Sequence, residues 1–247
     1  MSTPENAWMA RSLAALATDR AHVGDSAGAL QAAERLVASC AADPAAEGRS
    51  FVSGALVDLA IALQQSGDPA AAVTVGNRLD TAFGDRHDPA VRTDLARGLH
   101  NLALHRAEAG DLPGAIHAGT RLAWEFSADT DPVIREAVAR GMRNLAIDQA
   151  TAGDLTTAIA TAEQLAERYG ADIATPVRTA VAGAMVNLAD HLTRAGRQDD
   201  AVAAGERLIA MFGSDTDAAV QQCVQRVRGS AGDADGPHTL SEFLGGD

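Results

Sequence analysis

The sequence contains no lysine, because arginine supplies all 20 of its Lys and Arg residues. This absence excludes a phosphate-binding loop that ends in lysine, a Schiff-base lysine and any other catalytic lysine. Acidic residues number 33, which gives a formal net charge of −13. Such a chain repels phosphate backbones, so its charge argues against nucleic-acid binding.

Aromatic residues make up only 3% of the chain, and alanine is abundant, so the composition favours helices over strands. Two cysteines, Cys40 and Cys223, are too few for a disulfide framework and indicate free thiols in a reducing cytosol. No apolar stretch approaches the roughly 18 residues that span a bilayer, and residues 1–10 show no signal peptide. We therefore expect a soluble cytoplasmic protein. Arginine without lysine, together with abundant alanine, is typical of high-GC bacteria.

A turn of small residues recurs along the chain at a fixed interval. Its five glycines follow one another every 43 residues: Gly24, Gly67, Gly110, Gly153 and Gly196. An alanine stands five residues after each of them: Ala29, Ala72, Ala115, Ala158 and Ala201. Large residues keep the same interval as Phe83, Phe126, Tyr169 and Phe212, and Cys40 takes this place in the first repeat. A period of this length indicates a repeat architecture.

Each repeat shows the pattern of two helices joined by the glycine turn. In the fourth repeat, Asp131 can cap a first helix that has Pro132 at its first position and ends at Gly153. A second helix is predicted from about Leu155 to Arg168. Asp88-Pro89 predicts the same start in the third repeat. Because one helical hairpin cannot bury its apolar face alone, the sequence predicts an all-α fold: an α-solenoid of five helix-turn-helix repeats plus a C-terminal capping helix.

The predicted organisation is a solenoid over residues 1–228 and a flexible acidic tail over residues 229–247. The repeats are placed at about 1–43, 44–87, 88–130, 131–173 and 174–216, and the cap helix at 217–228. Trp8 and Met9 are expected to cover the N-terminal end. In the tail, Leu240, Phe243 and Leu244 are a possible docking motif for a partner or for the protein's own groove; the alternative is a disordered tail.

The repeats resemble the tetratricopeptide repeat (TPR) family over roughly residues 6–216. That family has a leucine-small pair, a glycine eight residues after the leucine and an alanine five further on, and Leu102-Ala103, Gly110 and Ala115 fit this pattern. The period departs from the family's 34 residues, and Leu99 and Arg106 occupy its first-helix tryptophan and tyrosine positions. The resemblance implies a long-period TPR-like variant.

In TPR folds the first helices line a concave groove that binds extended peptides or partner helices. The resemblance implies these partner-binding residues: Asp58, Arg97, His100, Asn101, Arg140, Arg143, Asn144 and Asn187. Asparagine amides can clamp a peptide backbone, and the arginines favour an acidic or carboxylate-bearing partner. The alternative is structural, with asparagines bonded between repeats and arginines paired with nearby acids.

No catalytic motif is present, and the scattered carboxylates form no recognisable acid/base pair. His100 and His105 are five residues apart, which is a poor metal-ligand spacing on a helix, so we expect no metal and no cofactor. Arg49, Arg92, Arg135 and Arg178 form a second column, for which we predict structural ion pairs such as Asp88 with Arg92.

The leading hypothesis is a non-enzymatic interaction scaffold that binds a peptide or protein in its groove. One alternative is a regulatory receptor for a small molecule or signalling peptide. Another is a self-assembling structural protein, whose end or tail docks onto a second copy. A catalytic site formed between repeats would leave no sequence motif.

Overall fold

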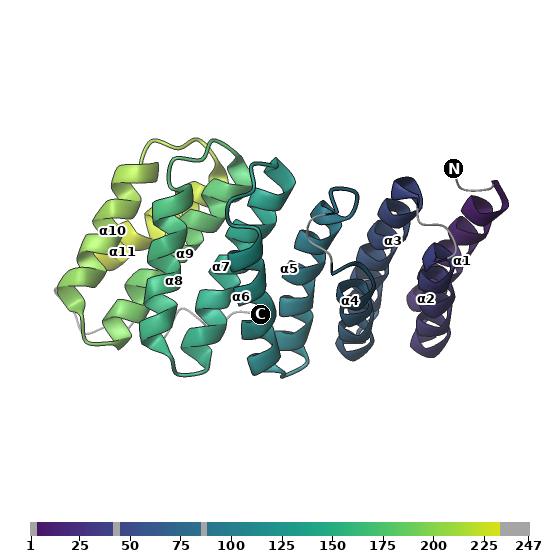
Figure 1. Ribbon diagram of the computed structural model, residues 1–247. Helices are drawn as coiled ribbons and strands as arrows, with labels where there is room; N and C mark the ends of the chain where they lie inside the picture. Colours follow the sequence, from purple (N-terminus) through teal and green to yellow (C-terminus); the bar gives the residue numbers. More distant parts are fainter. Residues whose placement is uncertain (1–3, 42–44, 85–87, 233–247) are drawn as a thin grey trace. The chain divides into compact units, whose positions relative to one another are not determined.

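The computed structural model describes residues 4–41, 45–84 and 88–232, and every regular element in these ranges is an α-helix (Figure 1). In chain order the helices are α1 (Pro4–His22), α2 (Ser26–Ala41), α3 (Ala46–Gln65), α4 (Pro69–Phe83), α5 (Arg92–Glu108), α6 (Leu112–Glu125), α7 (Pro132–Thr151), α8 (Leu155–Tyr169), α9 (Thr175–Arg194), α10 (Gln198–Phe212) and α11 (Ala218–Gly232). The predicted all-α solenoid class is confirmed. The helix α11 extends past residue 228, where the sequence placed its end.

Contacts between helices group the chain into two compact units, Met1–Gly141 and Met142–Asp247. In the first unit, α1 packs on α2 and α3, α3 packs on α4 and α5, and α5 packs on α6. In the second unit, α9 packs on α8, α10 and α11. Within each unit these contacts join helices at most two elements apart, as stacked hairpins require.

Each hairpin turns at a glycine in the left-handed region, with φ +81° at Gly110 and +89° at Gly153. Gly24, Gly67 and Gly196 share this conformation. A Cβ at any of the five would meet nothing within 4 Å, so the backbone alone requires glycine there. In four of the hairpins the next residue is an aspartate that caps the second helix, as where Asp154 Oδ1 accepts a hydrogen bond from the Thr157 amide at 3.0 Å. Arg197 takes this place in the fifth and makes no side-chain cap.

The start of α7 confirms the predicted capping. Asp131 Oδ1 accepts hydrogen bonds from the backbone amides of Val133 and Ile134 at 2.8 and 3.2 Å, and the helix begins at Pro132. Two amides that have no intrahelical acceptor are thereby satisfied.

The third repeat differs, because α5 begins at Arg92 and not at Pro89. Asp88 explains the difference. Its Oδ1 accepts from the Ala90 amide at 3.0 Å and its Oδ2 from Arg49 Nε at 2.6 Å, while the Val91 amide bonds the Asp88 carbonyl. These bonds hold residues 88–91 in a turn ahead of the helix.

The core contains mainly alanine and aliphatic side chains, with one large side chain near the end of a second helix in each repeat. Phe83, Phe126, Tyr169 and Phe212, which recur at the 43-residue interval, are buried; the side chain of Cys40 lies outside the described part of the structure. No helix in the described ranges is long and apolar enough to cross a membrane.

Candidate binding surface on the first helices

In the first unit, four of the predicted binding residues lie on two first helices that contact each other. Asp58 is exposed on α3, and Arg97, His100 and Asn101 are half-buried on α5. Residues 97, 100 and 101 share one helix face because they are three or four positions apart. The solenoid therefore gathers an arginine, an imidazole, an amide and a carboxylate on adjacent helices.

The charge of Arg97 is only partly balanced by its neighbour Asp94. The distance from Arg97 Nη1 to Asp94 Oδ1 is 3.8 Å, which is too long for a hydrogen bond. Asp94 is instead anchored by the buried Ser53, whose hydroxyl donates to Oδ2 at 2.6 Å. Next to this pair, a Cβ on Gly54 would make an ordinary 3.6 Å contact with the Asp94 carboxylate. The Arg97 guanidinium keeps donors available to a ligand.

Arg140 lies on α7 with its side chain 58% exposed. Its Nη1 donates to Glu136 Oε1 at 3.1 Å, one turn earlier on the same helix. An exposed pair of this kind contributes only a few tenths of a kcal/mol, about 0.3 to 0.5. The alternative in which the arginines form structural ion pairs is therefore only weakly supported at Arg97 and Arg140.

In the second unit, Arg143 lies across Gly183 of α9. Its Cδ and Nη1 are 3.3 and 3.4 Å from the position of a Cβ on Gly183, so the glycine makes room for this side chain. Its Nε is buried without a hydrogen-bond partner. No acidic side chain among the described residues pairs with Arg143.

Arg226 on α11 lies in the second unit with Arg143 and was missed by the sequence reasoning. It stands 43 residues after Gly183, in the column that holds Arg97 and Arg140, so the repeat itself was the signal. Its Nη2 is 3.7 Å from Asp190 Oδ2. Burial raises the pKa of the Cys223 thiol, and the positive charges of Arg143 and Arg226 oppose that rise. Both arginines therefore act on one thiol of the second unit.

The asparagine column shows unused hydrogen-bonding capacity. Asn101, Asn144 and Asn187 are half-buried, and none of their side-chain amides bonds another described residue. The alternative in which these amides bond between repeats is therefore unsupported in the described ranges. An amide at such a position can still donate to and accept from a ligand backbone.

The second arginine column forms structural ion pairs, as predicted, but with other partners. Arg92 Nε lies 2.5 Å from Asp129 Oδ2, and its guanidinium stacks 4.9 Å from the Phe126 ring centroid. Asp88, the partner predicted for Arg92, binds Arg49 instead, and Arg178 binds Asp215 at 2.7 Å. Each of these arginines reaches the loop after the next second helix, because stacking brings that loop beside it. The hydrogen bond from Arg49 lowers the pKa of Asp88, and that from Arg178 lowers the pKa of Asp215.

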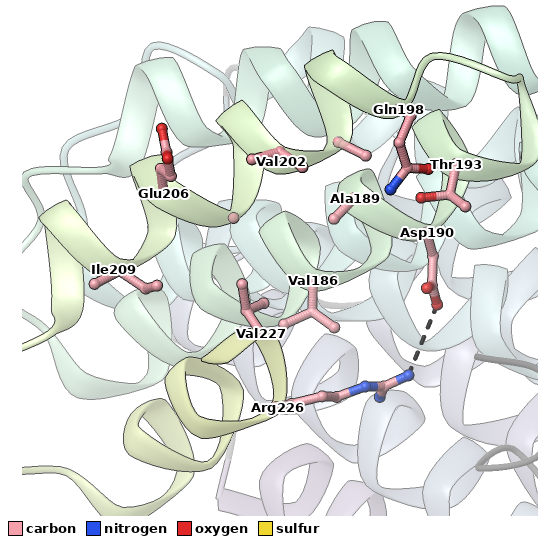
Figure 2. A pocket seen from close by; sticks show the side chains of 12 residues that line it. Val186, Ala189, Asp190, Thr193, Gln198, Val202, Glu206, Ile209, Arg226 and Val227 are labelled. Carbon is pink, nitrogen blue, oxygen red and sulfur yellow. Dashed lines mark ion pairs between the residues drawn. The ribbon is translucent and has the colours of Figure 1, made fainter. Parts of the chain in front are cut away.

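A pocket of about 180 Å³ lies in the second unit between α9, α10 and α11 (Figure 2). Val186, Val202 and Val227 form apolar walls, and the Asp190–Arg226 pair lies at one side. A cavity of roughly 150 Å³ holds one benzene ring, so this pocket fits a single ring or aliphatic side chain.

Two histidines lie in the core and not on the candidate surface. His105 and His191 are buried, and neither ring nitrogen of either residue has a hydrogen-bond partner in the described part of the chain. Burial lowers the pKa of both rings. No group of three His, Cys, Asp or Glu side chains in the described ranges is arranged to hold a metal ion. The tail residues Leu240, Phe243 and Leu244 lie outside the described residues.

No protein-family model matches the chain, and no curated protein matches its sequence. Solved structures do match its fold. One is a Podosopora anserina protein described as a kinesin light chain with nearly identical TPR-like repeats: TM-score 0.54, 16% identity, covering 90% of this chain and 95% of that one. A variant of the same protein gives 0.56 at 16% identity, over 95% and 99% of the two chains. The chain shares the fold of these TPR-like repeats.

Proposed function

We propose that the protein is a non-enzymatic scaffold whose first helices bind a peptide or protein partner. The observation that carries the proposal is the set of amides at Asn101, Asn144 and Asn187, half-buried and without a partner among the described residues. A half-buried amide that makes no hydrogen bond within the chain keeps its donor and acceptor available to a ligand backbone. The TPR-like fold supports the same function by analogy.

The chemistry of the surface favours a partner that carries carboxylates. Arg97 and Arg226 meet their acids only at 3.8 and 3.7 Å, and Arg143 has no acid partner in the described ranges. Guanidinium groups bind carboxylates through paired hydrogen bonds, and asparagine amides bind peptide backbone. An extended acidic segment supplies both groups.

The test is a double substitution on α7, Arg140→Glu with Asn144→Ala. Partners are captured from host extract, identified by mass spectrometry and then titrated by calorimetry. We expect the double variant to bind at least about tenfold more weakly, because it reverses one charge and removes one clamp.

The matched control is Arg168→Glu with Gln164→Ala on the exposed side of α8, which makes the same changes four residues apart on a second helix. The control should bind like wild type, and circular dichroism should show that both variants are folded. Equal binding by wild type and the α7 variant would refute the groove assignment.

A receptor for a small molecule is the second candidate, and the pocket between α9, α10 and α11 is what favours it. At about 180 Å³ it is smaller than the roughly 300–1,000 Å³ usual for ligand sites. A thermal-shift screen with single-ring metabolites tests this candidate. Stabilisation that Val202→Trp abolishes would support it, and no stabilisation by any compound would argue against it.

A further inference from the structure

The outer face of α1 exposes apolar side chains at positions that other first helices bury. The exposed fractions are 44% at Met9 and 41% at Leu16. One repeat later, the equivalent Val52 and Leu59 are each 1% exposed, because α3 packs against α1 and α2. Trp8 and Val23 extend the exposed face, at 72% and 79%. Among the described residues, the first helix thus exposes apolar side chains at positions that α3 buries.

These residues form one continuous stripe along α1. The stripe, called the α1 stripe below, consists of Trp8, Met9, Ser12, Leu16, Asp19 and Val23. From Met9 onward the members follow one another at three- or four-residue spacing, and Trp8 stands four residues before Ser12. They therefore lie along one face of α1, and Val23 continues that face one residue past the helix end at His22. At about 1.5 Å per residue, the stripe is roughly 22 Å long. Four of its six members are apolar, and an exposed cluster of large apolar side chains is typical of a protein–protein contact.

The other end of the repeat array offers no apolar complement. The exposed face of α11 is polar and carries Gln222, Gln225, Arg226 and Arg228. A polar outer face is what a capping helix needs for solubility, whereas α1 exposes Trp8, Met9 and Leu16 among its polar residues. A second copy therefore matches the α1 stripe better with its own α1 than with its α11.

The charged residues beside the stripe of one copy are complementary to those of a second copy. The midpoint of the stripe falls between residues 15 and 16, so two antiparallel helices place Trp8 opposite Val23 and Ser12 opposite Asp19. Arg11 of one copy then reaches Asp19 of the other. Both residues are exposed and have no ion pair with a described residue. Arg20, which also approaches Arg11 in this arrangement, is bound on its own chain by Asp25 at 2.6 Å.

We propose that the α1 stripe is a homodimer interface, in which two α1 helices pack antiparallel about a two-fold axis at Leu16. Two-fold dimers are the commonest soluble assemblies, and a self-complementary face is their requirement. The proposal concerns α1 alone and does not depend on the binding function proposed above.

Sedimentation equilibrium on the full chain tests the dimer. The wild type should sediment at twice its 25.3 kDa mass at micromolar concentration. Leu16→Glu places a charge in the centre of the interface and should raise the dissociation constant by roughly thirtyfold or more. The control Trp124→Glu changes an equally apolar residue, 84% exposed on the surface at α6, and should leave the dimer intact. A monomeric wild type, or a Leu16→Glu variant that dimerises as tightly as wild type, would overturn the proposal.

Disulfide trapping tests the antiparallel register. In a Cys40→Ser, Cys223→Ser background, Leu16→Cys should form an intermolecular disulfide on oxidation, because the residue meets its own symmetry mate. Val23→Cys alone should not, but it should cross-link to a Trp8→Cys chain when the two are mixed. Cross-linking of Val23→Cys with itself, without cross-linking of Leu16→Cys, would contradict this arrangement.

Discussion

Three ionisable residues, His105, Asp148 and His191, occupy one column of the repeat, at 43-residue steps. Burial raises the pKa of the Asp148 carboxyl to about 6 and lowers the pKa of both imidazoles. In each case the folded chain favours the neutral form, because charge is poorly solvated there. In these repeats the column packs against adjacent helices, so an ionisable side chain there lowers the free energy of unfolding.

Replacing Asp148 by asparagine should therefore stabilise the protein at pH 7. The folded pKa is raised from 3.8 to about 6, so the folded state binds the proton more tightly than the unfolded state. Ionisation then reduces stability above pH 4, and the full reduction is present above pH 6. After a discount for solvent screening at this half-buried site, we expect Asp148→Asn to add about 1 kcal/mol at pH 7.

Urea unfolding at several pH values measures this gain. It should shrink as pH falls from 6 towards 4, where Asp148 is neutral in both states. The two buried histidines destabilise wild type and variant alike as pH falls below 6.5, so the difference between the proteins isolates Asp148. Asp199→Asn, on the exposed surface of α10, serves as the control and should change little. A gain that is independent of pH would show that charge is not the cause.

At the scale of the helical elements, two glycines with opposite roles provide a matched comparison. Gly110 has φ +81° and no neighbouring atom within 4 Å of its Cβ position, so an alanine there is strained by the backbone alone. Gly54 lies within α3, where a Cβ would make only an ordinary 3.6 Å contact with Asp94. We expect Gly110→Ala to cost about 1 kcal/mol and Gly54→Ala to gain up to about 1 kcal/mol.

Thermal unfolding of the two variants beside wild type measures both effects. Because the chemical change is the same, an opposite sign of the shift in Tm assigns the difference to backbone conformation. Equal shifts for the two variants would contradict the assigned role of the turn glycine.

The positions of most helices could be predicted because helix ends depend on turn and capping residues that lie close in sequence and recur in each repeat. The turn at Gly153 and the cap at Asp131 need only neighbours within four residues, and both were predicted from sequence. The start of α5 was not, because Asp88 is held by Arg49 from the preceding repeat. Local signals could not reveal that competing bond.

The candidate site was predictable only in part for the same reason. Asn101 and Arg97 were found through the TPR pattern, which records helix faces. The weak contact of Arg97 with Asp94 depends on Ser53, which lies on another helix. The exposure of Leu16 depends on how α1 packs on α2 and α3, which leaves this side chain 41% exposed. The Arg97–Asp94 contact and the exposure of Leu16 both depend on how helices stack on one another. The residue pattern of a single helix does not encode that stacking.

At the scale of the whole molecule, the stacking of hairpins predicts that a core substitution destabilises mainly the helices near it. Leu208 on α10 is completely buried, so Leu208→Ala should cost about 2 to 4 kcal/mol. Within each unit the extensive contacts join near neighbours, so the loss should appear first in α9, α10 and α11. Native-state hydrogen exchange, read by mass spectrometry, should show faster exchange there and unchanged exchange in α1–α4.

The reciprocal variant is Leu36→Ala on α2, which is also completely buried. It should reverse the pattern, with faster exchange in α1–α4 and little change in α9–α11. Uniformly faster exchange along the chain in either variant would show that the repeats unfold as one cooperative body.

The ion pairs Arg49–Asp88, Arg92–Asp129 and Arg178–Asp215 also bear on how such a chain can change length during evolution. Each arginine pairs with an aspartate 37 to 39 residues further along the chain, in the loop after the next second helix. Asp129 and Asp215 stand in equivalent places of the repeat, and Asp88 stands two residues later in its own. If recombination duplicates or removes one whole repeat, an arginine still finds a loop aspartate 37 to 39 residues ahead of it. A gene with this periodicity can therefore vary in repeat number while the ion pairs between repeats are kept. An insertion or deletion of any other length would separate the arginine from its aspartate.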